Sequence, residues 1–161
     1  MLILDRNLNV PGGIIIQTAR VLALDVGEKR VGVAVSDPLG LTAQPLMVLP
    51  RRPHGVFLEK MAELRQTYQP AFVVVGLPRR TDGRLGPEAQ KAMALAHELK
   101  SRLDLRVTTW EEWMTTAEAE RLLKSDGLNS QKRREVIDKT AATLILEGYL
   151  HRYGPRLPEL S

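Results

Sequence analysis

Residues 21–36, VLALDVGEKRVGVAVS, decide the fold of this 161-residue chain. The stretch contains two short apolar runs, 21–26 and 31–36, and each has the length and composition of a buried strand. Only residues 27–30 separate the two runs. A link this short predicts that the two strands pair antiparallel as a hairpin.

Strands and helices are predicted to alternate along the rest of the chain. A third extended segment would complete three antiparallel strands, and strand–helix units follow it. This order predicts an α/β fold in which a mixed five-stranded sheet is flanked by helices. The further strands are predicted at 41–49, 71–76 and 105–110, and the helices at 56–66, 87–102, 130–150 and between the capping-box residue Thr115 and Gly127.

The length favours one domain with a substantial core. We expect residues 1–19 to be a poorly ordered extension, 20–152 to be the domain and 153–161 to be a tail. No apolar run approaches the roughly 18 residues of a membrane helix. The first twenty residues lack the basic start and long apolar middle of a secretory signal, so a cytoplasmic protein without membrane partners is expected.

Composition narrows the chemistry that the chain can perform. The chain has no cysteine, which excludes disulfides, thiolate metal sites and cysteine catalysis. His54, His97 and His151 lack ligand spacing, so zinc is not expected, and any metal should be a hard cation with oxygen ligands. The formal charge of +4 and the pI of about 9.6 favour a polyanionic partner.

The predicted topology gathers charged residues at one edge of the sheet. The carboxyl ends of four strands share that edge, where ligands bind in such sheets. Asp25 lies there, with Glu111 and Glu112 after the last strand. Basic residues around these acids could hold a phosphate backbone, although such residues are most often solvated surface. The basic residues predicted at this edge are Lys29, Arg30, Arg51, Arg52, Arg79, Arg80 and Arg84.

The last predicted helix has an unfavourable start. Lys132, Arg133 and Arg134 place cations at the positive end of the helix dipole, where a structural helix would prefer acids. Asp138 lies beside the apolar stripe of this helix. Because Ala141 and its neighbour are small, the helix could lie close to the sheet and bring Asp138 to Asp25. Local electrostatics of this kind are typical of ligand sites, and we expect the three cations to contact nucleic acid.

Together these motifs resemble the YqgF/RuvX family of Holliday junction resolvases, also described as nucleases that mature the small-subunit ribosomal RNA precursor. The resemblance covers nearly all of residues 20–149. It implies a ribonuclease H-like fold and carries the catalytic and metal-binding roles to Asp25, Glu112 and Asp138. The matching segments are 22–38 (LALDVGEKRVGVAVSDP), 45–46 (PL), 74–78 (VVGLP), 82–83 (DG), Glu112 with the threonines 115–116, and 133–146 (RREVIDKTAATLIL).

The chain departs from the family at residues 111–114. The family usually reads Asp-Glu-Arg-Leu before the paired threonines, whereas this chain reads EEWM. The expected glutamate is Glu112, and Trp113 replaces the arginine. Glu111 stays open as an additional metal ligand. Trp110 is predicted to belong to the core.

The resemblance implies an endonuclease that hydrolyses phosphodiester bonds by a two-metal mechanism, with Asp25 bridging two Mg²⁺ or Mn²⁺ ions. Branched DNA and precursor ribosomal RNA both stay open as substrates. Paired cuts in branched DNA would need a homodimer, whereas RNA trimming would not. Two alternatives remain at this point. One is a fragment of an actin-like or sugar-kinase phosphotransferase, whose nucleotide-binding hairpins share the pattern of residues 25–32, and the other is a non-catalytic nucleic-acid-binding module.

Overall fold

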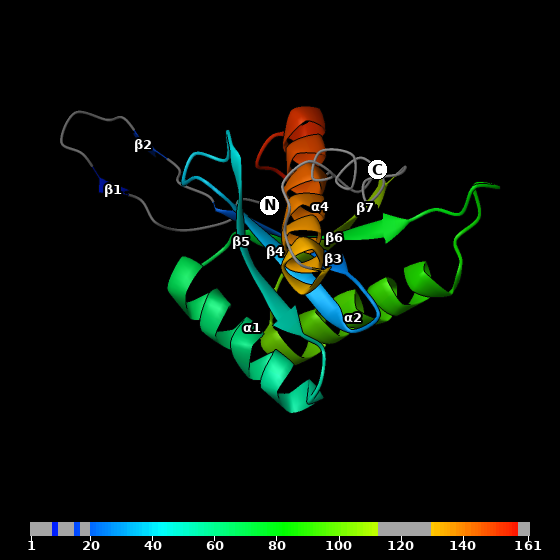
Figure 1. Cartoon of the computed structure of the whole chain (residues 1–161). Helices are drawn as coiled ribbons and strands as arrows, with labels where there is room; N and C mark the ends of the chain where they lie inside the picture. Colours follow the sequence, from blue (N-terminus) through cyan, green and yellow to red (C-terminus); the bar gives the residue numbers. More distant parts are fainter. Residues whose placement is uncertain (1–7, 10–14, 17–19, 113–129, 158–161) are drawn as a thin grey trace.

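The computed structural model describes residues 8–9, 15–16, 20–112 and 130–157, with residues 112 and 130–140 described by their backbone only (Figure 1). A five-stranded sheet has the order β5-β4-β3-β6-β7. Helices α1 and α2 cover one face of the sheet, and α4 covers the other (Figure 1). The elements of this domain are β3 (Val21–Val26), β4 (Arg30–Ser36), β5 (Ala43–Pro50), α1 (His54–Tyr68), β6 (Phe72–Pro78), α2 (Pro87–Leu103), β7 (Val107–Glu112) and α4 (Ser130–Tyr153).

The predicted hairpin is present. β3 and β4 pair antiparallel, with Asp25 opposite Gly32. The amide of Gly27 donates to the carbonyl of Arg30 at 2.8 Å and closes the turn. A Cβ atom at position 27 would stand 2.8 Å from that same carbonyl oxygen, so the turn requires glycine. β5 pairs antiparallel with β4, while β6 and β7 run parallel to β3. The predicted mixed five-stranded sheet, with three antiparallel strands followed by strand–helix units, is therefore confirmed.

β6 and β7 extend further than the sequence predicted. Both predicted strands end where their apolar runs end, at Gly76 and Trp110. In the structure the parallel ladder continues through Leu77–Glu111 and Pro78–Glu112. Leu77 is buried, whereas Pro78 and Glu111 are exposed and are held in extended form by backbone pairing. The extension places the acids at positions 111 and 112 within the sheet, instead of in a loop after it.

Each face of the sheet has its own apolar core. Leu22 and Leu24 pack with the buried side chains of α1 and α2, whereas Ala23 packs with those of α4. Ala141 and Ala142 of α4 are fully buried. Small residues on both the strand and the helix allow their backbones to approach closely, as the sequence predicted. The alternation along β3 therefore shows which face each of its residues occupies.

An aromatic cluster holds the second half of α4 to the sheet. Tyr149 is fully buried, and its hydroxyl donates to the carbonyl of Arg156 at 2.5 Å. Its ring lies 5.5 Å from Phe72 and edge-on to Trp110 at 6.0 Å. Burial, aided by the neighbouring Tyr153, raises the pKa of Tyr149. Trp110 thus contributes to the core on the α4 face, which confirms its predicted place.

The structure describes only parts of the two chain ends. β1 (Leu8–Asn9) and β2 (Ile15–Ile16) form a separate two-stranded antiparallel sheet. The disorder expected for the rest of 1–19 stays a prediction. Beyond α4, Leu157 packs against the core on the α4 face, so this part of the tail folds back. The helix predicted after Thr115 lies outside the described residues. Within the described ranges, no helix is long and apolar enough to span a membrane.

Candidate active site

The predicted charged edge exists as a continuous rim at the carboxyl ends of β3, β5, β6 and β7. Asp25 is the next-to-last residue of β3, and positions 111 and 112 end β7. Lys29 and Arg30 lie in and after the hairpin turn. The bases that follow strands at this rim are Arg51 and Arg52 after β5, and Arg79 and Arg80 after β6, with Arg84 further along the same loop.

Asp25 lies on the face that α4 covers. Its neighbours on β3 are Leu24, in the core under α1 and α2, and Val26, which packs against that core. Since successive strand residues alternate, Asp25 is on the other face and is half-buried there. On β7, Trp110 packs on the α4 face. Position 112, two residues later, falls on that same face.

The first half of α4 leads toward this end of the sheet. Tyr149 contacts Phe72, which pairs with Val21 at the start of β3. Asp25 lies about 13 Å further along that strand, at about 3.3 Å per residue. Position 138 lies about 16 Å before Tyr149 along the helix, at about 1.5 Å per residue. It also precedes the buried Ala141 and Ala142 by one helical turn, on the same side of α4. The helix therefore carries position 138 back to the level of Asp25.

Two glycines flank Asp25 on the neighbouring strands. Gly32 is its partner on β4 and lies on the same face. The register of β3 with β6 pairs Leu24 with Val75, and one step further it places Gly76 beside Asp25. Both glycines belong to segments that match the family, but the role of Gly76 was missed because the register was needed to see it.

Glu111 is separated from this group. It pairs with Leu77 across the parallel strands β6 and β7. Because Leu77 belongs to the core under α1 and α2, Glu111 lies on that same face. The Nε atom of Arg79 donates to its carboxylate at 3.0 Å, and Nη2 of Arg79 makes a second contact with the same oxygen. Arg79 also donates to the carbonyl of Gly83 at 2.8 Å. The predicted rim cation Arg79 thus neutralises Glu111 and holds the loop after β6.

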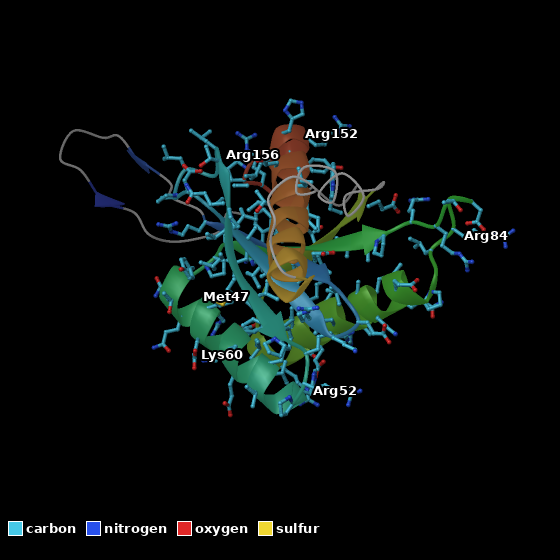
Figure 2. The ribbon with its side chains drawn as sticks, viewed as in Figure 1. Met47, Arg52, Lys60, Arg84, Arg152 and Arg156 are labelled. Carbon is cyan, nitrogen blue, oxygen red and sulfur yellow. The ribbon has the colours of Figure 1, made fainter. Side chains whose placement is uncertain are left out.

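The loop after β6 presents two other predicted cations to solvent. The amide of Arg80 donates to the carbonyl of Arg84 at 2.9 Å, and Gly83 turns the chain with a φ of 82°. Asp82 accepts from the amide of Arg84. Arg80 and Arg84 are exposed, and Figure 2 shows Arg84 far out on this loop, away from the helices.

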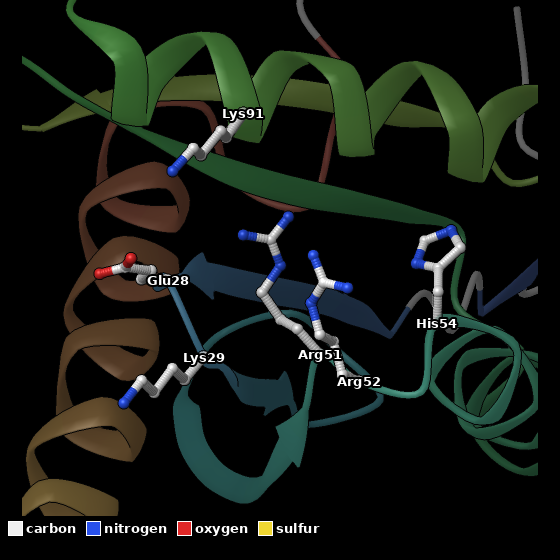
Figure 3. Close-up of a pocket in the computed structure, with 6 residues that line it drawn as sticks. All are labelled: Glu28, Lys29, Arg51, Arg52, His54 and Lys91. Carbon is white, nitrogen blue, oxygen red and sulfur yellow. The ribbon is translucent and has the colours of Figure 1, made fainter.

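The other predicted cations group around the hairpin. Arg51 donates from Nη1 to the carbonyl of Gly27 at 3.0 Å, and its amide donates to the carbonyl of Lys29. These bonds fix the segment after β5 against the hairpin. A cavity of about 700 Å³ opens beside them (Figure 3). Its lining residues are Glu28, Lys29, Arg51, Arg52, His54 and Lys91.

Part of the segment that matches the family has a structural role at the opposite edge. Ser36 is buried, and its hydroxyl accepts from the amide of Val21 at 2.8 Å. Asp37 accepts from the amides of Leu41 and Thr42, both at 2.7 Å. Burial acts to raise the pKa of Asp37, but these amide donors, with that of Leu39, hold it below the ordinary value.

The chemistry of the rim suits a hard metal ion. Among the described side chains, no three His, Asp or Glu residues form a metal-binding group. The side chains at positions 112 and 138 are outside that set, as are those of Lys132, Arg133 and Arg134 in the first turns of α4. The backbone nevertheless brings three carboxylate positions to one face and one end of the sheet. Carboxylate oxygens are the donors that Mg²⁺ and Mn²⁺ prefer.

Comparison with known proteins identifies the family. The model of the RuvX family, described as Holliday junction resolvase, matches residues 19–152. A candidate pre-16S rRNA nuclease of Pelotomaculum thermopropionicum is 46% identical over 136 residues, which cover 84% of this chain and 88% of the relative. A protein of the same name from Moorella thermoacetica is 46% identical over 135 residues, covering 84% and 96%.

Solved structures of low sequence identity are also similar. RuvC of Thermus thermophilus, in complex with a Holliday junction substrate, has a TM-score of 0.48 and 17% identity, covering 85% of this chain and 97% of that one. The fowlpox virus Holliday junction resolvase has a TM-score of 0.48 and 12% identity, covering 83% and 98%. The family match and the close relatives carry the assignment: this chain belongs to the RuvX family.

Proposed function

We propose that this protein is a divalent-metal-dependent endonuclease that hydrolyses phosphodiester bonds in structured nucleic acid. The observation that supports the proposal is that the carboxylate positions 25, 112 and 138 lie at one end and on one face of the sheet, with Gly32 and Gly76 beside Asp25. The relatives' names and the family description support this reaction class.

The three carboxylates would hold the metal. Asp25, on the central strand, would hold the metal together with Glu112 and Asp138. When bound, Mg²⁺ or Mn²⁺ supplies an activated water and stabilises the leaving oxygen. Glu111 is left out of the ligand set, because it lies on the other face and is paired with Arg79.

The rim cations would position the backbone of the substrate without reading its sequence. Arg80 and Arg84 lie on one side of the carboxylates, after β6. Lys29 and Arg30 lie on the other side, in the hairpin. The cations at positions 132–134 open the helix that carries Asp138, so the positive start of that helix would face a polyanion.

Two substrates are candidates. The names of the relatives point to the precursor of 16S ribosomal RNA, and the family description points to the Holliday junction. Both contain strands that leave a duplex. The family match favours this nuclease over the phosphotransferase fragment and over a non-catalytic module.

We expect cleavage to require a hard divalent cation. The protein should be incubated in parallel with a four-way DNA junction and a precursor rRNA end, with Mg²⁺, with Mn²⁺ and with a chelator. Cleavage of at least one substrate with metal, and of neither in chelator, is the expected result. Undiminished cleavage in chelator, with metal shown to be absent from the protein, would contradict the proposal.

A further inference from the structure

The cavity beside the hairpin lies at the rim but on the side of α1 and α2. Lys91 enters it from α2 and His54 from the first turn of α1, while the hairpin supplies Glu28 and Lys29 (Figure 3). Asp25 lies on the opposite face of the sheet. Only residues 26–28 separate Asp25 from Lys29, a span of at most about 14 Å. The cavity is therefore a neighbour of the candidate active site and distinct from it.

The lining of this cavity is strongly positive. Lys29, Arg51, Arg52 and Lys91 are permanent cations, and Glu28 is the acid that lines it with them. Within the described part of the chain, Lys29, Arg52 and Lys91 form no ion pair. His54 is held by Glu98 at 2.7 Å, and Arg51 is held by the carbonyl of Gly27. Because these positive side chains line one cavity, they favour the binding of an anion that carries several charges.

The size of the cavity limits which kind of polyanion can bind in it. A volume of about 700 Å³ is within the range of small-molecule sites. A duplex, with its two strands wound together, is too wide to enter. A single strand can turn into such a cavity, with its phosphates on the four cations. Among the described lining residues His54 provides the one ring, so the contacts would be to phosphate rather than to base.

We propose that this cavity binds the phosphates of a single-stranded segment next to the bond that is cut. The strand would pass from the face of Asp25, over the hairpin tip, and into the cavity. This inference rests on the proposed function. It adds α2, through Lys91, to the surface that contacts substrate, and it predicts a preference for duplexes that carry a single-stranded extension.

The test compares binding of a blunt duplex with binding of the same duplex carrying a single-stranded tail, on either strand, in chelator. The parent protein should bind the tailed duplex more tightly. Lys91→Glu should reduce this advantage by roughly tenfold, and each lost phosphate contact should flatten the salt slope by about 0.7. Lys100→Glu is the matched control, because Lys100 is an exposed lysine of the same helix, nine residues away and outside the cavity. Thermal melting confirms that both variants fold.

Two outcomes would overturn the inference. One is that the parent shows no tail advantage, whether or not a free nucleotide such as ADP binds at this cavity. The other is an equal loss of the advantage in both variants. Because the assay contains no metal, it does not depend on catalysis. A protein that shows the tail advantage but cleaves nothing with Mg²⁺ or Mn²⁺ would contradict the proposed function, while the binding of a single-stranded segment at this cavity would stand.

Discussion

Replacing Asp25 by asparagine is expected to lower cleavage by several orders of magnitude while the protein stays folded. Asparagine has nearly the same shape as aspartate, so the half-buried position between Leu24 and Val26 keeps its packing. The variant loses the negative charge that the proposed metal ligand needs, and a neutral amide cannot replace it. Rates at saturating metal and substrate, together with melting temperatures, measure both effects.

Asp37→Asn is the control for Asp25→Asn. Both aspartates lie in the same family-matching segment, but Asp37 is at the opposite edge, and its carboxylate accepts hydrogen bonds from the amides of Leu39, Leu41 and Thr42. Its loss should lower the melting temperature, because the amide donors favour the charged form, and should leave the rate per folded molecule unchanged. If Asp25→Asn cleaves like the parent, Asp25 is not a ligand of the catalytic metal.

Asp138→Asn should lower cleavage as Asp25→Asn does. Its effect on stability should differ from that of replacing a structural aspartate. A structural aspartate that loses its charge would destabilise the fold by about 1–3 kcal/mol. A metal ligand beside two other carboxylates is repelled by them when no metal is bound. A neutral isostere relieves that repulsion, so the variant should melt at the same temperature as the parent, or higher, in chelator.

Added Mn²⁺ gives the second part of this test. A ligand that binds only the folded state stabilises it by about 2.7 kcal/mol at one hundred times its dissociation constant. The parent should gain stability with Mn²⁺, and Asp138→Asn should lose much of that gain. Nucleic-acid binding in chelator should be kept or improved in the variant. A variant that is less stable in chelator and still cleaves would remove Asp138 from the active site.

Much of the architecture could be predicted from the sequence, because its signals are local. The two apolar runs with a tight glycine turn predict the hairpin, and the order of the later elements predicts the sheet edge where Asp25 lies. The ends of β6 and β7 could not be predicted in this way, since the exposed Pro78 and Glu111 are held by backbone pairing and not by burial.

The site was predicted less completely, because its parts meet only in three dimensions. Glu111 and Glu112 are adjacent in sequence, and they lie on different faces because β7 extends to include both, which its apolar run did not predict. The sequence places Arg79 among the rim cations, but it does not reveal the ion pair with Glu111, which is 32 residues away. Lys91 lies in a helix whose charges would ordinarily be solvated, and no spacing connects it with the hairpin. The roles of Glu112 and Asp138 were inferred from the family resemblance.

The adjacent glutamates of β7 offer the most direct measurement of the central claim, that the metal centre is built on the α4 face. Glu112→Gln and Glu111→Gln make the same chemical change one residue apart, so cleavage rates of the two variants with Mg²⁺ and Mn²⁺ compare the two faces. We predict that Glu112→Gln loses cleavage by orders of magnitude. Glu111→Gln should keep it, with at most a small loss of stability from the partly exposed contact with Arg79. Loss of cleavage in Glu111→Gln, with activity retained in Glu112→Gln, would place the reaction on the other face and contradict this account.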